Sequence, residues 1–326
     1  MNWSHDRQLG VLSCIPAVQR SQLLTYGSRS VDQKKDIAKS NLDRTVAPPE
    51  KGSSDLAHRT EQRPNNNAVA RIVERINAVV VPHSWFYYFY AFSSVASAFW
   101  LQQIISRGTP IVILAQLQCP APLENSTPSM TSSQMLLTVT LVILHSARRL
   151  YESIEFSRSS LSSMPLAHWG LGVSFFAALS VSTWIHGSAD LLSDNSVLRF
   201  TSWSLLSYFS APSIRTVCCL SLYLLASGIQ HDCHDYLAGL RKYTLPRHPA
   251  FKSLLCPHYT AECVIYLSLA VIAAPAGSIV NPTLFTTLYF TVVNLAITAE
   301  GTRQSYTRRF GADQIQGKWR MIPWIW

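Results

Sequence analysis

The sequence has few charged residues for its length. Only 14% of its 326 residues are Asp, Glu, Lys or Arg, whereas an ordinary soluble domain carries about 25%. Hydrophobic residues make up 48% of the chain, and they include 9 Trp, 13 Tyr and 13 Phe. This balance argues against a water-soluble domain and favours a protein embedded in a membrane.

Several common kinds of site are also missing. There is no glycine-rich strand–turn–helix fingerprint, which excludes a Rossmann domain. The seven cysteines include no CxxC pair, so we expect no disulfide framework. His231 and His234 are only three residues apart and no second ligand pair of zinc-site spacing follows, so we expect no metal. The net charge of +9 comes without an aromatic–basic pattern, so we expect no nucleic-acid partner.

Apolar segments of membrane length recur along the chain. They predict an all-α, multi-span integral membrane helix bundle with six spans, at about 85–105, 135–145 with its flanks, 166–185, 203–228, 263–280 and 283–299. Only Asn281-Pro282 separates the last two spans, which predicts a tight helical hairpin. Residues 1–80 are polar, and we expect them to form a disordered or truncated region before a membrane-embedded domain at 81–326.

Lysine and arginine are distributed unevenly between the two sides of this bundle. Six spans place residues 1–82, 146–165, 229–260 and 300–326 on one side, and these stretches hold twelve, three, four and five Lys/Arg. The opposite loops, 106–133 and 186–199, hold one each. The positive-inside rule therefore predicts that the basic side, with the carboxyl terminus, is cytosolic. The glycosylation sequon at Asn125 falls in an opposite loop, which agrees with this orientation.

Two polar stretches border the spans on the basic side. In the first, His145, Arg149 and Glu152 follow at helical spacing and share one face. In the second, which covers residues 229–262, Gln230, His234 and Arg241 also share one face when the stretch is read as a helix. A further polar group, 256–259, precedes the fifth span, with Glu262 four residues beyond His258. The alternative for 229–262 is a solvated loop whose charge only sets orientation.

The sixth span continues as a third polar face. Asn294, Thr298, Thr302, Tyr306 and Arg309 follow at steps of three or four residues. Helix packing through small polar residues accounts for Asn294 and Thr298, but less well for Tyr306 and Arg309. We expect the three faces to converge near the cytosolic membrane surface, where basic side chains around a polar site favour a polyanionic ligand held beside lipid. A phosphorylated cofactor acting on a lipid is the simplest such pair.

Taken together, these motifs resemble the steroid 5α-reductase family, and in particular its polyprenal (polyprenol) reductase branch. The resemblance covers about residues 80–326. The blocks that carry it are Val81-Pro82 with Trp85-Phe86 and Phe89-Tyr90, Leu144-His145-x-x-Arg148-Arg149-Leu150-Tyr151-Glu152, Gln230-x-x-Cys233-His234-x-x-Leu237-x-x-Leu240-Arg241-Lys242, Cys256-Pro257-His258-Tyr259-x-Ala261-Glu262, and Ile322-Pro323-Trp324-Ile325-Trp326.

The resemblance implies a multi-pass enzyme of the endoplasmic reticulum membrane, with seven spans in the family. It would use NADPH to reduce the double bond next to the carbonyl of a long-chain polyprenal, on the route to dolichol for protein N-glycosylation. Hydride adds to the β carbon only when a carbonyl takes up the charge, so the substrate must be an enal or enone. The alternatives are a reductase of sterol or terpenoid enones and a non-catalytic membrane relative.

The resemblance also implies roles for individual residues. Arg241 with Lys242 is expected to bind the 2′-phosphate of NADPH, because a guanidinium recognises phosphate bidentately. His145 and Tyr151 are expected to polarise the carbonyl, with Tyr88 behind them at a position where the branch usually has His. The remaining residues expected around the cofactor are Gln230, His234, His258, Glu262 and Tyr306, with Arg148, Arg149 and Lys318 as further phosphate contacts.

Overall fold

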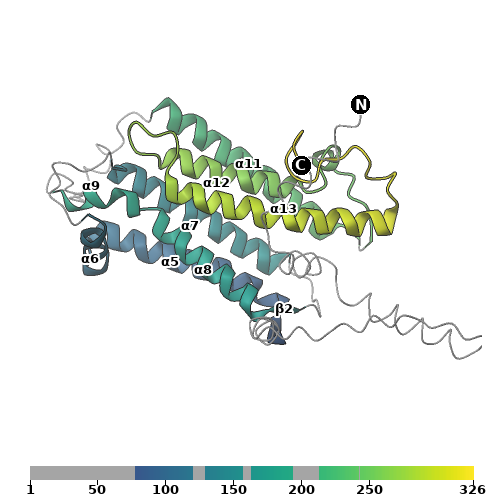
Figure 1. Cartoon of the computed structure of the whole chain (residues 1–326), viewed down its shortest axis with the longest axis horizontal. Coiled ribbons are helices and arrows are strands. Elements are labelled where there is room, and N and C mark those ends of the chain that lie inside the picture. Colours follow the sequence, from purple (N-terminus) through teal and green to yellow (C-terminus); the bar gives the residue numbers. More distant parts are fainter. Residues whose placement is uncertain (1–77, 120–128, 157–162, 194–212, 242) are drawn as a thin grey trace, which may run out of the picture.

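The computed structural model describes residues 78–119, 129–156, 163–193, 213–241 and 243–326. Within these residues, six long helices run side by side along the length of the molecule (Figure 1). They are α5 (Tyr87–Ser106), α7 (Ser132–Glu155), α8 (Leu166–Ser182), α11 (Ile214–Gly239), α12 (Pro257–Ile272) and α13 (Pro282–Phe310). The predicted helical class is confirmed, and the long helices occupy the stretches predicted as spans, except that residues 203–212 lie outside the described residues.

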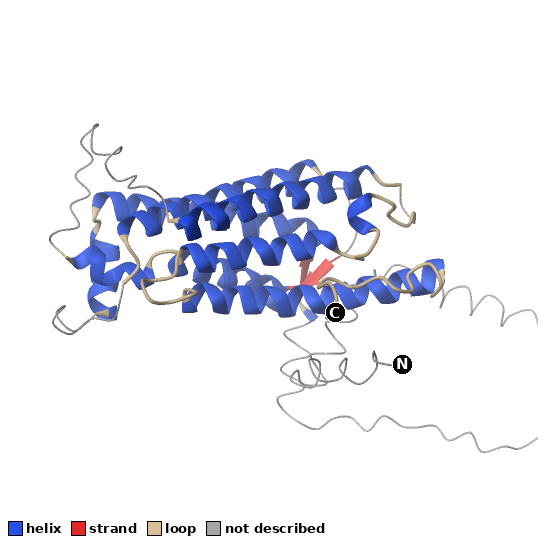
Figure 2. Cartoon of the chain, turned by 90° about the horizontal axis from the view of Figure 1, so that it is seen from above, coloured by secondary structure: helices blue, strands red, loops and turns tan. Residues whose placement is uncertain are grey.

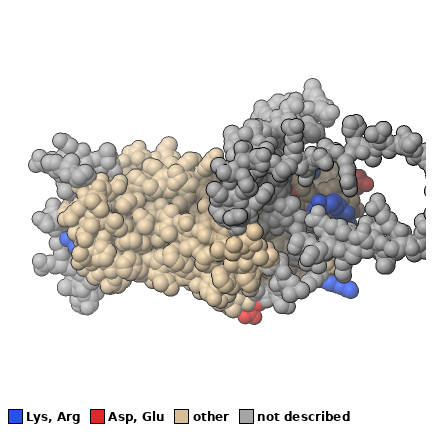
Figure 3. Space-filling model, turned by 60° about the horizontal axis from the view of Figure 1, so that its bottom comes forward, with Lys and Arg blue, Asp and Glu red and all other residues tan. Residues whose placement is uncertain are grey.

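Membrane character is clearest in two parts of the bundle. Leu166–Leu192, which begins with α8, and Pro282–Phe310, which is α13, are long and apolar enough to cross a membrane. On the face shown in Figure 3, a broad uncharged surface of described residues carries charged side chains only at its margins. The count of six spans remains a prediction, as does the nature of residues 1–80, of which 1–77 lie outside the described residues.

The helices define two ends of the bundle. One end holds the start of α12, the end of α13 and a two-stranded antiparallel sheet of β1 (Val80–Pro82) and β2 (Ser163–Pro165), with Val81 opposite Met164. We call it the basic end, because its exposed side chains include Arg241, Arg247, Lys252, Arg308 and Arg309. The strands tie the start of α5 to the start of α8, and Figure 2 shows the sheet confined to this one place among the helices.

Short elements close the opposite end. They are α6 (Thr109–Gln118), η3 (Ile185–Gly187) and α9 (Ser188–Leu192). Residues 106–133 were expected to be a loop, but α6 forms within them because its Ile111 and Ala115, four residues apart, are buried on one side. Two further 3-10 turns, η1 (His83–Phe86) and η4 (Pro249–Phe251), lie at the basic end.

The predicted hairpin between the last two long helices is present. Asn281 lies just before α13, and its side-chain oxygen accepts hydrogen bonds from the backbone N–H groups of Thr283 and Leu284. Its side-chain amide donates to the carbonyl of Ala273 at 3.1 Å, beyond the end of α12. One buried side chain therefore caps the second helix and holds the end of the first.

Two hydrophobic cores hold the helices together. The main core lies between the long helices and includes fully buried residues such as Val139 on α7 and Ile265 on α12. A second core at the basic end joins Cys256, Ala299 and Met321. There the carboxyl-terminal segment runs beside residues 254–256, and the N–H of Cys256 donates to the carbonyl of Arg320 at 3.0 Å. This segment fixes the start of α12, where His258 and Glu262 lie.

Candidate active site

A buried carboxylate organises a polar cluster between α7 and α11. Glu152 is only 2% exposed. Its Oε1 accepts from Arg148 Nη1 at 2.6 Å and lies 2.8 Å from His231 Nδ1. Its Oε2 accepts from Arg149 and lies 2.8 Å from His234 Nδ1. Four basic side chains from two helices therefore meet at one carboxyl group.

The helical repeat brings these side chains together. Arg148 and Arg149 precede Glu152 by four and three residues on α7, so all three lie on neighbouring positions of one helix surface. His231 and His234 are three residues apart on α11 and form the facing set. The helical face predicted for residues 145–152 is therefore confirmed as part of a contact between helices.

A second carboxylate, Glu262 on α12, extends the cluster toward the middle of the bundle. Its Oε2 accepts from the side-chain amide of Gln230, and its Oε1 lies 3.3 Å from His145 Nε2. The side-chain oxygen of Gln230, Oε1, in turn accepts a hydrogen bond from Arg148. Gln230 is only 2% exposed, and it links the carboxylate of α12 to the arginine of α7.

The cluster balances its own charge. Glu152 and Glu262 carry two negative charges, and Arg148 and Arg149 carry two positive ones. Ionised groups inside a protein are tolerated when they are paired and hydrogen-bonded, because an unpaired buried charge loses its hydration without compensation. Both guanidinium groups are therefore already engaged by protein partners.

Tyr90, on α5, brings a hydroxyl group to this cluster. Arg149 Nη2 donates to the Tyr90 hydroxyl at 3.1 Å, and the guanidinium lies 5.0 Å from the centre of the Tyr90 ring. The side chain is buried, at 6% exposed. Because the oxygen accepts from arginine, its own proton is left to be donated to another group. A buried, arginine-supported hydroxyl can stabilise negative charge on an oxygen atom.

Tyr90, Glu152 and His231 belong to the cluster, although the sequence motifs give none of them a role at the site and only Glu152 lies on a predicted polar face. For Glu152 a signal existed, since a carboxylate three and four residues after two arginines forms helical ion pairs. His231 had been considered only as a metal ligand. Tyr90 is 59 residues from Arg149 in the chain, so no local pattern could pair them.

His258 lies beside the cluster at the start of α12. Its ring centre is 5.3 Å from that of His234. Its Nδ1 is buried and has no hydrogen-bond partner within the part of the chain that the structure describes. A buried ring nitrogen without a partner is costly, which makes it a candidate contact for a ligand.

Some predicted residues lie outside the cluster. Tyr151 is 57% exposed, because it lies one position before the buried Glu152 and so about 100° away around the helix. Its ring contacts that of Phe156. Tyr88 is 42% exposed and packs on Tyr87. Neither tyrosine reaches His145 through any contact in the described residues.

Arg241 does not share a helical face with Gln230 and His234, as had been expected. α11 ends at Gly239, and the backbone of Leu240 is extended, so Arg241 lies beyond the helix with an exposed side chain. Glycine is a weak helix former, which accounts for the early end. Lys242 lies outside the described residues.

The third polar face forms a separate group. On α13, Glu300 pairs with Arg303 at 2.9 Å and with Arg320 of the carboxyl-terminal segment. Tyr306 packs against the second core, and the Lys318 amine donates to the backbone carbonyl of Phe251 at 2.9 Å. The predicted convergence therefore holds for two of the three faces, the one on α7 and the one formed by α11 with α12. It is wrong for the third, because α13 makes its own ion pairs through Glu300.

No group of three or more His, Cys, Asp or Glu side chains in the described residues is arranged to hold a metal ion. The expectation that the protein binds no metal remains a prediction.

Comparisons with known proteins show what the chain is similar to. Residues 180–326 match the family described as 3-oxo-5-alpha-steroid 4-dehydrogenase, and this range contains the cluster residues of α11 and α12. The match confirms the resemblance to the steroid 5α-reductase family and, with the relatives below, indicates an oxidoreductase that acts on carbon–carbon double bonds.

Longer matches are to individual enzymes. The polyprenal reductase of Xenopus tropicalis is 27% identical over 262 residues, which are 75% of this chain and 80% of that protein. The polyprenal reductase of Saccharomyces cerevisiae is 24% identical over 82% of this chain and 83% of its own length. The very-long-chain enoyl-CoA reductase of Dictyostelium discoideum is 26% identical over 56% of this chain and 55% of its own length.

The charge balance predicts that Glu152→Gln destabilises the protein strongly. The substitution leaves Arg148 and Arg149 inside the bundle without a counter-ion next to them, and breaking a buried pair in this way costs about 3–5 kcal/mol. Glu155→Gln is the matched control, because Glu155 is on the same helix and exposed. Thermal unfolding in detergent should show a large loss for the first variant and almost none for the second. Equal losses would show that Glu152 is not the organising charge.

Proposed function

We propose that the protein is an NADPH-dependent reductase of the α,β double bond of a polyprenal, acting in the endoplasmic reticulum membrane on the route to dolichol and so supporting protein N-glycosylation. The observation that carries the proposal is the buried cluster around Glu152 and Glu262, inside a largely apolar bundle and next to a basic end. The names of the relatives from Xenopus tropicalis and Saccharomyces cerevisiae support the choice of substrate.

The chemistry requires a donor at the substrate oxygen. As hydride reaches the β carbon of an enal, negative charge develops on the carbonyl oxygen, and a fixed hydrogen-bond donor lowers the energy of that state. We assign this donor to the Tyr90 hydroxyl, which Arg149 already supports at 3.1 Å, and we propose His145 as a second polar group for the same oxygen. Tyr151 and Tyr88 are less suited because their side chains are exposed.

Two observations support a dinucleotide cofactor: the buried Nδ1 of His258 has no partner among the described residues, and exposed arginines lie at the basic end. When bound, NADPH supplies the hydride. Arg148 and Arg149 are paired with Glu152, so a phosphate would have to compete with that carboxylate. The exposed Arg241 with Lys242 is the better phosphate partner, followed by Lys318. The other candidates to line the cofactor are Gln230, His234, His258, Glu262 and Tyr306.

The proposed orientation follows from charge. The basic end would face the cytosol, with the carboxyl terminus on that side. The cofactor would then enter from the water at the basic end, and the lipid substrate would enter from the membrane. The two reactants would meet at His145 and Tyr90, deeper in the bundle.

A steroid enone is the second candidate substrate, because residues 180–326 match a family described by its action on a 3-oxo steroid. Steroid enones and polyprenals need the same hydride addition and the same donor to oxygen. They differ in shape, so substrate choice depends on the hydrophobic part of the site.

We predict that membranes carrying the protein oxidise NADPH when polyprenal is added. Polyprenal, a steroid enone and a long-chain enoyl-CoA are offered in parallel, and the absorbance of NADPH is followed with the reduced product. Turnover of the steroid alone would replace the proposed substrate. If NADPH is oxidised with none of the three substrates, the result would contradict a catalytic function.

Tyr90→Phe should lower kcat by about a hundredfold, the size typical of losing one donor to a developing oxyanion. The KM for NADPH should stay near its original value, because the ring and the cluster remain. Tyr289→Phe is a control, since Tyr289 is exposed on α13. A rise in the KM for NADPH at unchanged kcat would move Tyr90 out of the carbonyl role.

Arg241→Ala should weaken binding of NADPH much more than binding of NADH, because only NADPH carries the 2′-phosphate that a guanidinium can grip. The comparison variant is Arg247→Ala, which removes another exposed arginine six residues away. Titration of both cofactors against the purified protein gives the two affinities. Equal losses for NADPH and NADH would refute the 2′-phosphate assignment.

A further inference from the structure

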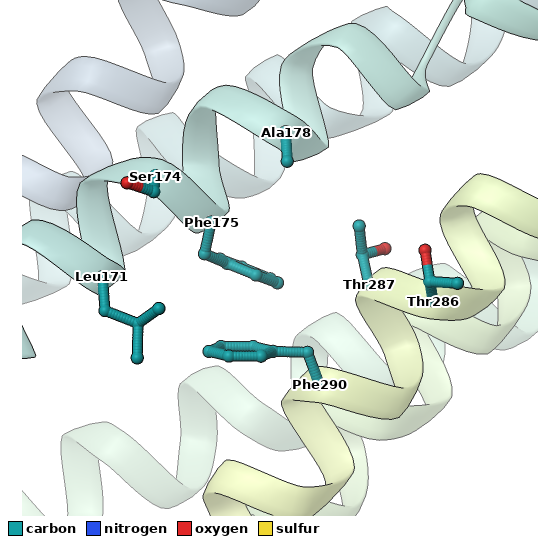
Figure 4. Close-up of a pocket in the computed structure, with 7 residues that line it drawn as sticks. All are labelled: Leu171, Ser174, Phe175, Ala178, Thr286, Thr287 and Phe290. Carbon is teal, nitrogen blue, oxygen red and sulfur yellow. The ribbon is translucent and has the colours of Figure 1, made fainter.

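A groove lies between α8 and α13, outside the polar cluster. It has a volume of about 290 Å³ and is lined by Leu171, Phe175 and Ala178 of α8 and by Thr287 and Phe290 of α13. Figure 4 shows the rings of Phe175 and Phe290 pointing toward one another across the space between the two helices. Their ring centres are 5.0 Å apart in a stacked arrangement.

The groove lies on the outside of the bundle. Its two walls are the segments that are long and apolar enough to cross a bilayer, Leu166–Leu192 and Pro282–Phe310. Leu171 is 51% exposed at its edge, and the neighbouring Tyr289 is 66% exposed. Such apolar exposure is stable in lipid, and it allows a ligand to enter from the side without crossing water.

The groove offers no strong donor to a polar ligand. Its hydroxyl groups already donate to carbonyls of their own helices: Ser174 to Gly170 at 3.0 Å, Thr286 to Thr283 at 2.7 Å, and Thr287 to Leu284 at 2.7 Å. The other lining residues are hydrocarbon. The lining of the groove therefore favours an apolar ligand, such as a hydrocarbon chain.

Aromatic rings connect the groove to the candidate active site. The ring of Phe175 lies 6.0 Å from that of Tyr266, and Tyr266 lies edge-on to His145, also at 6.0 Å. The next residue, Phe176, lies 5.5 Å from Tyr90. Phe175 and Phe176 of α8 therefore lie between the groove and the two residues assigned to the carbonyl, His145 and Tyr90.

We propose that the groove between α8 and α13 binds the isoprenoid tail of the substrate, near its reacting end. The tail lies on the outer side of Phe175 and Phe290 and extends into the bilayer. The rings of Phe175 and Tyr266 separate the groove from His145, so they turn aside when the carbonyl reaches His145 and Tyr90. This inference rests on the proposed function, and it names the part of the protein that recognises the tail.

Ala178→Phe tests the proposal, because it fills the groove from its exposed side. The KM for a long polyprenal should rise by about tenfold or more, since tail contacts worth a little over 1 kcal/mol are lost. The kcat/KM for 3-methylbut-2-enal, which has only the reacting isoprene unit and no tail to lie in the groove, should stay within about twofold. The matched control is Ala98→Phe, an exposed alanine on α5, which should change neither value.

A second measurement does not depend on turnover. A polyprenol carrying a photoreactive group in its first isoprene units should crosslink to peptides of α8 and α13, and Ala178→Phe should abolish that crosslink. Unlabelled polyprenol should compete, whereas phospholipid should not. Competition by phospholipid would make the groove a site for membrane lipid and overturn the proposal.

The outcomes separate this inference from the proposed function. If the unaltered protein reduces both enals and Ala178→Phe impairs them equally or not at all, the reductase function stands and the tail site is wrong. If the unaltered protein reduces neither enal, the proposed function fails. In that case, the absence of a polyprenol crosslink would overturn the tail site as well.

Discussion

The buried carboxylate of Glu152 is the constraint on which the inner structure depends. It neutralises two adjacent arginines of its own helix and meets two imidazoles of α11. Two guanidinium groups could not lie side by side in a low-dielectric interior without such a partner. Glu262 on α12 meets His145 of α7 in a similar way, and Gln230 connects the two carboxylates through Arg148. A chain poor in charge therefore concentrates several of its charges in one balanced group.

This group runs along the bundle rather than across it. His145 and Glu152 are seven residues apart on α7, a distance of about 10 Å along a helix. Glu152 lies toward the basic end, and His145 lies deeper, behind the rings of Tyr266 and Phe175. In the proposed reaction, this length lets a charged cofactor and an apolar substrate approach from different surroundings and meet in between.

Packing at the basic end keeps the site in place. The carboxyl-terminal segment lies against residues 254–256 and bonds to α13 through Arg320 and Glu300. The start of α12, with His258 and Glu262, is therefore held between this segment and α11. α13 contributes to the scaffold through the ion pair of Glu300 and, from its predicted polar face, through Tyr306 at the second core. That face does not enter the cluster.

Local periodicity determined much of this from the sequence alone. Low charge and long apolar runs predicted a membrane helix bundle, and the spacing of residues 145, 149 and 152 predicted one polar face, because both patterns act within single helices. The predicted position of Arg241 on the face of α11 is wrong, because the helix ends at Gly239, a weak helix former, before it reaches Arg241. Which faces meet was decided only by tertiary packing: α7 meets α11 and α12, and Tyr90 comes from α5 to support Arg149. Contacts between segments distant in the chain leave no spacing pattern, so they became visible only when the helices packed together.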